Sequence, residues 1–309
     1  MNDHTTQYVG DRQRRRLEWR FGVHVRTWLA GLPATVDELA EKWHLTVCSG
    51  GPYGRTAVIV PVTLTDGREG VLKLSPDSGL AVSEAQLLRI WADSGRVPLV
   101  WGLDHERGAI LMERIDGDTV ADKGVVPPME SVGSLIADLH TIEVDRAQSD
   151  ELRPLMARVQ YVFEQYSRAR AEGPAAEVIP ASMINQGHSR ARELVNGTTR
   201  VVPVHGDHHP GNVIDGGERG LVAVNPRACV GDGAIDAVDW VLWKATTIEE
   251  MERRASVLSR KMNVDGDRLM EWARAFAPCA AVAKVNKGHG GTAEFDALME
   301  LSELALAAR

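Results

Sequence analysis

Eight residues at positions 205–212, HGDHHPGN, combine a carboxylate, three histidines and an amide in one short segment. The apolar runs VVPV at 201–204 and LVAV at 221–224 flank it, and each is typical of a short buried strand. Polar residues at strand ends lie on a rigid scaffold, where binding and catalytic groups are usually found. Asp207 and Asn212 lie on either side of a Pro-Gly turn, so both side chains are placed to reach one point. A carboxylate accepts a proton from a hydroxyl and an amide oxygen binds a hard cation, so the pair predicts proton transfer beside Mg²⁺.

The same segment resembles the catalytic loop HGD-x-H-x-x-N of the aminoglycoside phosphotransferase-like kinases, which are distant relatives of protein kinases. Downstream, VGDGAIDAVDW at 230–240 is similar to GDPAFDAVDW in the subgroup of streptomycin 6-phosphotransferases and hydroxyurea phosphotransferases. The resemblance extends from WLAGLP at 28–33 to WARAFA at 272–277. It implies an α+β, bilobal protein-kinase-like fold with a β-rich N-lobe and a mainly helical C-lobe. It also implies ATP-dependent phosphorylation of a hydroxyl on a small-molecule antibiotic or related polar metabolite, in antibiotic resistance or secondary metabolism.

One departure from the family affects the expected metal site. The strand after the loop ends in Val-Asn-Pro with Asn225 at its centre, where the family has Ile-Asp-Pro and that Asp binds the Mg²⁺ that bridges the ATP phosphates. Asn225 keeps one oxygen but lacks the charge and the second oxygen of a carboxylate. Hard divalent cations prefer carboxylates, so we expect Asn212 and Asn225 to bind Mg²⁺ weakly. The resemblance therefore implies ATP and Mg²⁺ as cofactors, and Asn225 is expected to weaken the binding of Mg²⁺.

The departure leaves three functional interpretations open. Phosphotransfer could continue slowly or with Mn²⁺ in place of Mg²⁺. Alternatively, a degenerate kinase fold without phosphotransfer binds a small molecule, or performs other chemistry in a biosynthetic pathway. A deliberate replacement of the Asp, made to trap a substrate complex, would leave the same sequence.

Lys73 and Glu84 are the expected phosphate-binding pair. Lys73 lies within the apolar strand segment VLKLS, and the resemblance makes it the lysine that contacts the ATP phosphates, with Glu84 as its ion-pair partner. An edge-strand lysine that faces solvent is the alternative, because alternate strand positions face outward. Ser83 is expected to start the following helix, so that the helix dipole offers a competing reason for Glu84 in the first turn. The resemblance places Lys73 and Asp207 on opposite sides of a nucleotide-sized gap between lobes.

Two further segments belong to the expected nucleotide site. Residues 49–54, SGGPYG, occupy the position of a glycine-rich loop over the phosphates, although a plain turn fits equally well because GxGxxG is missing. Met112, Glu113 and Ile115 are expected to line the adenine pocket, chiefly through backbone groups. The default alternative for these three is an ordinary hydrophobic strand end.

Asp207 is expected to orient and deprotonate the acceptor hydroxyl for in-line attack on the γ-phosphate. We interpret His205 and His209 as structural residues that hold the loop by bonding backbone carbonyls. His208 is expected to face the substrate cleft, with a surface histidine as the alternative. Zinc binding is improbable at this spacing, because cysteine ligands are missing nearby.

The acidic residues after the loop have separate expected roles. Asp236 is expected to support the loop by accepting backbone hydrogen bonds. Asp232 is a candidate substrate-binding residue that could also lend its carboxylate to the metal. Trp272 and His289 are the remaining candidates for the acceptor pocket. Phe276 and Glu294 fit the same pocket or ordinary helix packing.

Composition limits the partners and the compartment. The chain has 309 residues and a net charge of −8, which argues against a nucleic-acid partner and is compatible with a cationic small molecule. The three cysteines are far apart and form no CxxC pair, which fits a reducing cytoplasm. The N-terminal segment lacks an apolar signal core, and no apolar run approaches about 18 residues. We expect a cytoplasmic protein that has no membrane partner.

The pattern of elements predicts the two lobes. Residues 1–113 are expected to form the N-lobe, with two helices separated by a break at Pro33, two β-hairpins, and a helix beginning at Ser83. Residues 114–123 are the expected hinge, and residues 124–309 the helical C-lobe that contains the catalytic loop.

Overall fold

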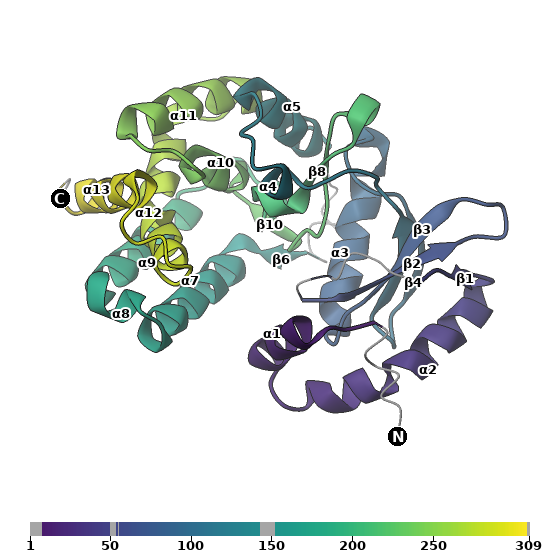
Figure 1. Cartoon of the computed structure of the whole chain (residues 1–309). Coiled ribbons are helices and arrows are strands. Elements are labelled where there is room, and N and C mark those ends of the chain that lie inside the picture. The colour runs from purple at the N-terminus through teal and green to yellow at the C-terminus, as the bar shows by residue number, and fades with distance from the viewer. Residues whose placement is uncertain (1–7, 50–53, 55, 143–151, 308–309) are drawn as a thin grey trace. The chain divides into compact units, whose positions relative to one another are not determined.

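The computed structural model describes residues 8–49, 54, 56–142 and 152–307. The described residues of Met1–Ala92 and Val97–Asp116 form one compact unit, and those of Asp93–Arg96 and Gly117–Arg309 form a second. After Asp116 the chain passes into the second unit, within the segment 114–123 for which a hinge is predicted. The hinge role itself stays a prediction. Figure 1 labels helices and strands of both units.

The first unit is built on an antiparallel sheet with the strand order β1-β2-β3-β5-β4. Both predicted hairpins are present in it, β2 with β3 and β4 with β5. The strands are β1 (Thr46–Val47), β2 (Val58–Thr63), β3 (Glu69–Leu74), β4 (Val100–Asp104) and β5 (Ala109–Glu113). The helices are α1 (Asp11–Phe21), α2 (Val25–Trp43) and α3 (Ser78–Ile90), and the 3-10 turn η2 (Ala92–Ser94) follows.

The core of this unit lies between α1, α2 and the sheet. One face of α2 buries Leu29, Leu32, Val36 and Leu39 against apolar side chains of β2 and β3. This stripe continues past Pro33, which lies inside α2, so the predicted break there is wrong. Burial of the apolar stripe on both sides offsets the hydrogen bond that a proline removes. The break comes earlier, at Gly22, which adopts a left-handed φ of 81° after α1.

The position of α3 corrects a second expectation. This helix begins at Ser78, where the Asp77 side chain accepts a hydrogen bond from the Leu80 N–H and acts as the N-cap. Ser83 lies inside the helix and donates its hydroxyl to the Gly79 carbonyl, so its predicted capping role is wrong. Glu84 consequently lies in the middle of the helix, beyond the first turn where the helix dipole acts.

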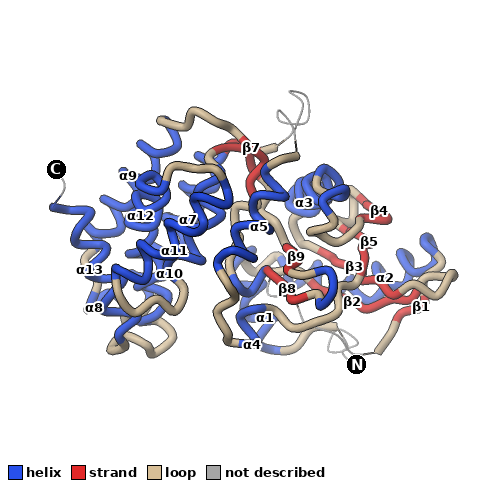
Figure 2. The backbone as a smooth tube through the Cα atoms, turned by 90° about the horizontal axis from the view of Figure 1, so that it is seen from above, coloured by secondary structure: helices blue, strands red, loops and turns tan. Residues whose placement is uncertain are grey.

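The second unit is mainly helical. Helix α12 packs against α9 and α13, and α5 packs against α11; Figure 2 shows α9, α12 and α13 side by side. Its helices are α4 (Val120–Lys123), α5 (Met129–His140), α7 (Leu155–Glu172), α8 (Ala175–Val178), α9 (Ala181–Asn196), α10 (Val238–Leu242), α11 (Ile248–Met262), α12 (Gly266–Val285) and α13 (Ala293–Ala307). Its short strands are β6 (Arg153–Pro154), β7 (Val202–Val204), β8 (Val213–Asp215), β9 (Leu221–Ala223) and β10 (Cys229–Gly231). The 3-10 turns are η3 (Pro210–Asn212), η4 (Gly217–Arg219) and η5 (Gly233–Ala237).

The two units together confirm the predicted α+β class, with a sheet-based N-terminal part and a helical C-terminal part. Strand β7 pairs antiparallel with β10, and β8 pairs antiparallel with β9. These pairings place the segment 205–212 and the residues after β9 beside each other in the helical unit. Within the described residues, none of the helices is both long and apolar enough to cross a membrane.

Candidate active site

Asp236 holds the start of the catalytic loop in place. Its Oδ2 accepts the backbone N–H of His205 at 2.8 Å, and its Oδ1 accepts that of Gly206 at 3.0 Å. His140 Nε2 lies 3.0 Å from Oδ2 and completes the set of donors. Asp236 is only 2% exposed, and a buried carboxylate persists when such donors satisfy it. The predicted supporting role of Asp236 is confirmed.

His205 ties the loop to the segment after β9. Its Nε2 donates to the Val224 carbonyl at 3.0 Å, and its Nδ1 accepts the Asp207 N–H at 3.3 Å. The Val224 N–H donates to the Asn212 carbonyl at 2.9 Å. Gly206 has a φ of 71°, and a Cβ at this residue would lie 2.6 Å from the Arg227 carbonyl oxygen. Only glycine fits this turn. The loop 205–212 therefore packs closely against the segment that follows β9.

The Asp207 carboxylate has a hydrogen-bond donor on each oxygen. Arg158, on α7, donates from its Nη2 to Oδ1 at 2.7 Å and from its Nε to the Gly206 carbonyl at 2.6 Å. Asn212 Nδ2 donates to Oδ2 at 3.1 Å and to the Asp207 carbonyl at 2.9 Å. The Asp207 side chain remains 31% exposed, so it is fixed in orientation and still accessible.

Electrostatics keep this carboxylate ionised. Burial acts to raise the pKa of Asp207, but the charges of Arg158, His209 and Arg227 lower it well below the ordinary value. A carboxylate with a lowered pKa is a weak base. It is suited to accepting a hydrogen bond from a hydroxyl and holding it in one orientation.

Asn212 and Asn225 are joined by a hydrogen bond. Asn225 Nδ2 donates to Asn212 Oδ1 at 3.2 Å, and Asn225 has a left-handed φ of 61°. The oxygen expected to bind Mg²⁺ therefore accepts a hydrogen bond from an N–H donor. Among the described residues, no group of three or more Asp, Glu, His or Cys side chains could hold a metal ion. As arranged, these two amides do not fit a divalent cation, which prefers carboxylate oxygens.

His208 does not lie where the sequence suggested. It is buried, and its Nδ1 accepts the indole N–H of Trp240 at 2.9 Å and lies 3.0 Å from the Asp236 carbonyl. Burial lowers the pKa of His208 to about 3, so the ring is neutral near pH 7. The expectation that His208 faces the substrate cleft is wrong, because this histidine packs in the core below the loop. His209 also differs from expectation, since its Nδ1 accepts the Gly211 N–H and does not bond a carbonyl.

Asp232 and Trp272 bind each other in the interior. Asp232 Oδ2 accepts the indole N–H of Trp272 at 2.7 Å and the Arg268 Nε–H at 2.6 Å, and Oδ1 caps η5 through the Ala234 N–H. Trp272 is fully buried. The predicted substrate-binding roles of both residues, and the metal role suggested for Asp232, are therefore wrong. Their polar atoms are used to join η5 to α12.

The remaining acceptor-pocket candidates lie in α12, in the turn that follows it and at the start of α13. His289 is exposed in the turn between α12 and α13, and its role in substrate binding stays a prediction. Glu294 accepts the Lys244 backbone N–H at 2.7 Å and the Lys284 ammonium at 2.5 Å. Phe276 packs edge-on against Phe163, with ring centroids 5.1 Å apart. These contacts favour helix packing for Glu294 and Phe276.

Two charged residues near Asp207 were missed as site candidates. The sequence contains only a weak indication of Arg158: it is a cation next to the apolar residues Leu155 and Val159 on one helix. Asp239, on α10, is an exposed residue. Its pKa is nevertheless raised, because nearby protein atoms keep water from the carboxyl group and Asp207 adds a negative charge, against the opposing charge of His209. An exposed carboxylate whose charge interacts with that of Asp207 is available to a cationic or hydrogen-bonding group.

Lys73 and Glu84 form a buried ion pair in the first unit. Lys73 Nζ lies 2.5 Å from Oε1 and 2.6 Å from Oε2 of Glu84, and the two residues are 7% and 4% exposed. Strand β3 lies between β2 and β5, so the alternative of an edge-strand lysine is wrong. A buried lysine held by a carboxylate from α3 matches the expected ion pair. Contact with phosphate stays a prediction.

The expected adenine-binding residues follow the same sheet. Met112 and Glu113 end β5, and the Glu113 N–H donates to the Leu99 carbonyl at 2.8 Å. Ile115 is half-buried two residues later. Their contact with a nucleotide stays a prediction. Most of the expected glycine-rich loop, residues 50–53, lies outside the described residues.

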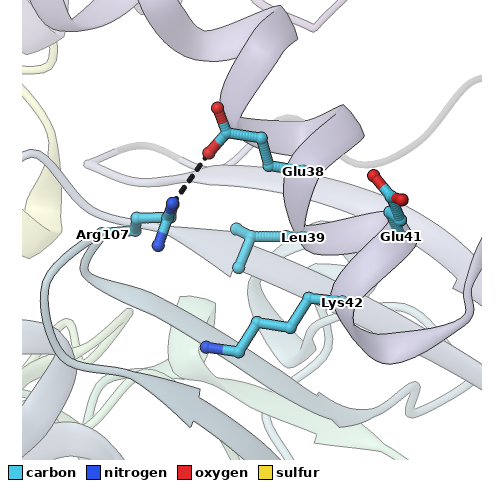
Figure 3. A pocket seen from close by; sticks show the side chains of 5 residues that line it. All are labelled: Glu38, Leu39, Glu41, Lys42 and Arg107. Carbon is cyan, nitrogen blue, oxygen red and sulfur yellow. Dashed lines mark hydrogen bonds and ion pairs between the residues drawn. The ribbon is translucent and has the colours of Figure 1, made fainter.

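A hollow of about 310 Å³ in the first unit contains none of the predicted residues. It is lined by residues of α2 and by Arg107, as Figure 3 shows. Arg107 pairs with Glu38 at 2.8 Å, and Lys42 pairs with Asp104 at 2.8 Å. Because these charges already have partners in the protein, the hollow is a poor candidate for a charged ligand.

Comparisons with known proteins agree with this geometry. The family described as aminoglycoside/hydroxyurea antibiotic resistance kinase matches residues 42–288. The chain is 29% identical to streptomycin 6-kinase of Streptomyces glaucescens, over 82% of each protein. It is 26% identical to hydroxyurea phosphotransferase of Kitasatospora aureofaciens, over 81% of this chain and 72% of that one.

Solved structures show the same fold at lower identity. A choline kinase from Streptococcus pneumoniae matches 90% of this chain and 99% of its own, with a TM-score of 0.59 and 15% identity. A spectinomycin phosphotransferase in complex with ADP and spectinomycin matches 89% and 97%, with a TM-score of 0.56 and 13% identity. The loop, its supporting aspartate and the match over most of the chain lead to one conclusion: the chain belongs to the aminoglycoside/hydroxyurea antibiotic resistance kinase family.

Proposed function

We propose that the protein transfers the γ-phosphoryl group of ATP to a hydroxyl of a small-molecule antibiotic or a related polar metabolite. The observation that supports this most is the Asp207 carboxylate, held ionised and accessible in a loop of kinase-family sequence. Each carboxylate oxygen can accept two hydrogen bonds. An acceptor hydroxyl can therefore donate to Asp207 while Arg158 and Asn212 remain bound.

In the proposed reaction, the acceptor oxygen forms a bond to the γ-phosphorus as the bond to the β–γ bridging oxygen breaks and ADP leaves. The hydroxyl proton passes to Asp207. Because the transition state of phosphoryl transfer is loose, positioning contributes more than base strength. The lowered pKa of Asp207, set by burial against the charges of Arg158 and others, is compatible with that role.

On the nucleotide side, the proposal assigns the phosphates to Lys73, with Glu84 fixing its position. The backbone around Met112, Glu113 and Ile115 is assigned to the adenine ring. Mg²⁺ enters this proposal only as the ion that ATP phosphates carry in solution, because the chain offers it two hydrogen-bonded amides at 212 and 225.

For the acceptor, the proposal favours a molecule with a cationic group near its reacting hydroxyl. Asp239 is exposed near Asp207 and can receive an ammonium or guanidinium group. The relatives are named for streptomycin and hydroxyurea, and one structure holds spectinomycin. These three compounds therefore form the first panel of acceptors. His289 is kept as a further candidate contact on the acceptor side.

The test is phosphorylation by the purified full chain. The protein is incubated with ATP and each acceptor, in Mg²⁺ or in Mn²⁺, and both ADP and the phosphorylated acceptor are measured. We expect product with at least one compound, and loss of product in Asp207→Asn, which keeps the side-chain shape but cannot take the proton. Failure of the whole panel with both metals, in protein that binds ATP, would overturn the proposal.

Asn225 supports one second candidate, a kinase-fold protein that binds its small molecule without transferring phosphate. The donor set at 212 and 225 favours it, since a cation ligand of the family is missing. Calorimetry separates the two functions. Binding of a panel compound without formation of ADP, by the unchanged chain and by Asn225→Asp, would favour the second function.

A further inference from the structure

The carboxylate and the two amides of the site form a continuous chain of hydrogen bonds. Asn225 donates to Asn212 Oδ1 at 3.2 Å, and Asn212 donates with its Nδ2 to the carbonyl and the carboxylate of Asp207. Arg158 donates to the other carboxylate oxygen at 2.7 Å. These hydrogen bonds converge on Asp207 from both sides, and every acceptor meets an N–H donor.

Chemistry fixes the orientation of both amides. Asn212 faces two acceptors on Asp207, so its NH₂ group must point toward them and its oxygen must point away. That oxygen faces Asn225, which must therefore present its own NH₂ group. A flip of either amide would bring two oxygens together without a hydrogen between them. The contact at 3.2 Å is consequently an N–H···O bond, whichever way an amide is first assigned.

A carboxylate at position 225 would face Asn212 Oδ1 with no proton to share. Two such oxygens repel each other, and a divalent cation between them relieves the repulsion, which is how paired oxygen ligands bind Mg²⁺ or Mn²⁺. We infer that the Asn225 amide takes the place of a divalent cation. The loop 205–212 then keeps its conformation through hydrogen bonds, without a metal held by residues 212 and 225. A single change, Asn225→Asp, creates a divalent-cation site there.

The backbone at this position allows the test. Asn225 has a left-handed φ of 61°, a conformation in which Asn and Asp are both enriched, so Asn225→Asp adds little backbone strain. Asn263 offers a matched control, because it also has a left-handed φ, of 52°, and is exposed at the end of α11. Asn263→Asp adds the same charge without facing an amide oxygen that could share a cation.

The experiment uses Mn²⁺ alone, with no nucleotide or acceptor. Thermal unfolding of the full chain is measured in EDTA and over a MnCl₂ titration, and bound Mn²⁺ is counted by the electron paramagnetic resonance signal of the free ion. We expect no saturable response from the unchanged protein or from Asn263→Asp. Asn225→Asp should melt lower in EDTA, recover with Mn²⁺, and bind it about ten-fold or more tightly than the unchanged protein.

Three results would overturn the inference. The first is saturable Mn²⁺ binding by the unchanged protein at the affinity of Asn225→Asp. The second is an Asn225→Asp variant that neither melts lower nor gains Mn²⁺, and the third is the same gain in the double variant Asn212→Ala/Asn225→Asp. If Asn225→Asp folds neither in EDTA nor with Mn²⁺, the Mn²⁺ titration of the unchanged protein tests the inference: saturable binding contradicts it, and its absence supports it. Phosphorylation is not a readout here, so failure of the proposed function leaves the result intact.

Discussion

Replacing Asp236 by alanine should destabilise the helical unit more than almost any other single change in the loop region. Asp236 accepts hydrogen bonds from the His205 and Gly206 N–H groups and contacts His140 Nε2, all within a buried cluster. Asp236→Ala leaves these donors without their acceptor. A buried unsatisfied group costs about 1–3 kcal/mol, so the loss of three such hydrogen bonds is expected to cost about 3–9 kcal/mol. That is a large part of the roughly 5–15 kcal/mol by which domains are stable.

The assay is urea unfolding followed by far-ultraviolet circular dichroism and tryptophan fluorescence. Asp267→Ala, which removes an exposed carboxylate from the start of α12, is the control and should stay within about 0.5 kcal/mol of the parent. Burial acts to raise the pKa of Asp236, but the hydrogen bond and the charge of His140, together with the other nearby histidines, outweigh it and the pKa is lowered. The stabilisation is therefore present above the unfolded-state pKa of about 4 and is lost as pH falls through the folded value. A loss below about 1 kcal/mol at pH 7 would refute this reasoning.

Two further changes test the two halves of the proposed machinery. Glu84→Gln removes the negative charge that faces the buried Lys73 ammonium and should destabilise the first unit by about 3 kcal/mol, measured by thermal unfolding; an equal Tm in Glu84→Gln and the parent would contradict this. Burial raises the pKa of Asp207 while the Arg158 charge lowers it, so Arg158→Met should raise that pKa. The acid limb of kcat/KM against pH should then move to higher pH, while Arg158→Lys keeps it nearer the parent profile; an unmoved limb in Arg158→Met would show that Arg158 does not set this pKa.

Much of the site could be predicted because its residues are close in sequence. Asp207 and Asn212 lie five residues apart in a rigid turn, so their hydrogen bond follows from local geometry. The two hairpins were likewise predictable from short apolar runs separated by turn residues. Local patterns determine structure well where neighbouring residues supply most of the contacts.

Long-range packing decided what the sequence did not predict. Arg158 reaches Asp207 from 49 residues away, and only the packing of α7 brings them together. His208 was expected to face the cleft because a histidine there departs from the apolar residues common in the family, yet Trp240 supplies a buried partner for it. Pro33 remains inside α2 because burial of apolar side chains on both sides outweighs one lost hydrogen bond. In each case the deciding contact involves a partner that is distant in the sequence.

The departure at position 225 is better understood as a built feature than as decay. A decayed metal site would leave acceptor oxygens facing one another, at a cost for each buried group. Here Asn212 Oδ1 accepts a hydrogen bond from Asn225, and Asn212 Nδ2 donates to Asp207. The backbone at 225 adopts a left-handed conformation that Asn favours. Asp207 is held in its orientation and its ionised state by Arg158. Asn225 therefore stands in place of the family's metal ligand while the geometry of Asp207, to which we assign the acceptor hydroxyl, is preserved, so that the proposed chemistry and the altered metal site can coexist.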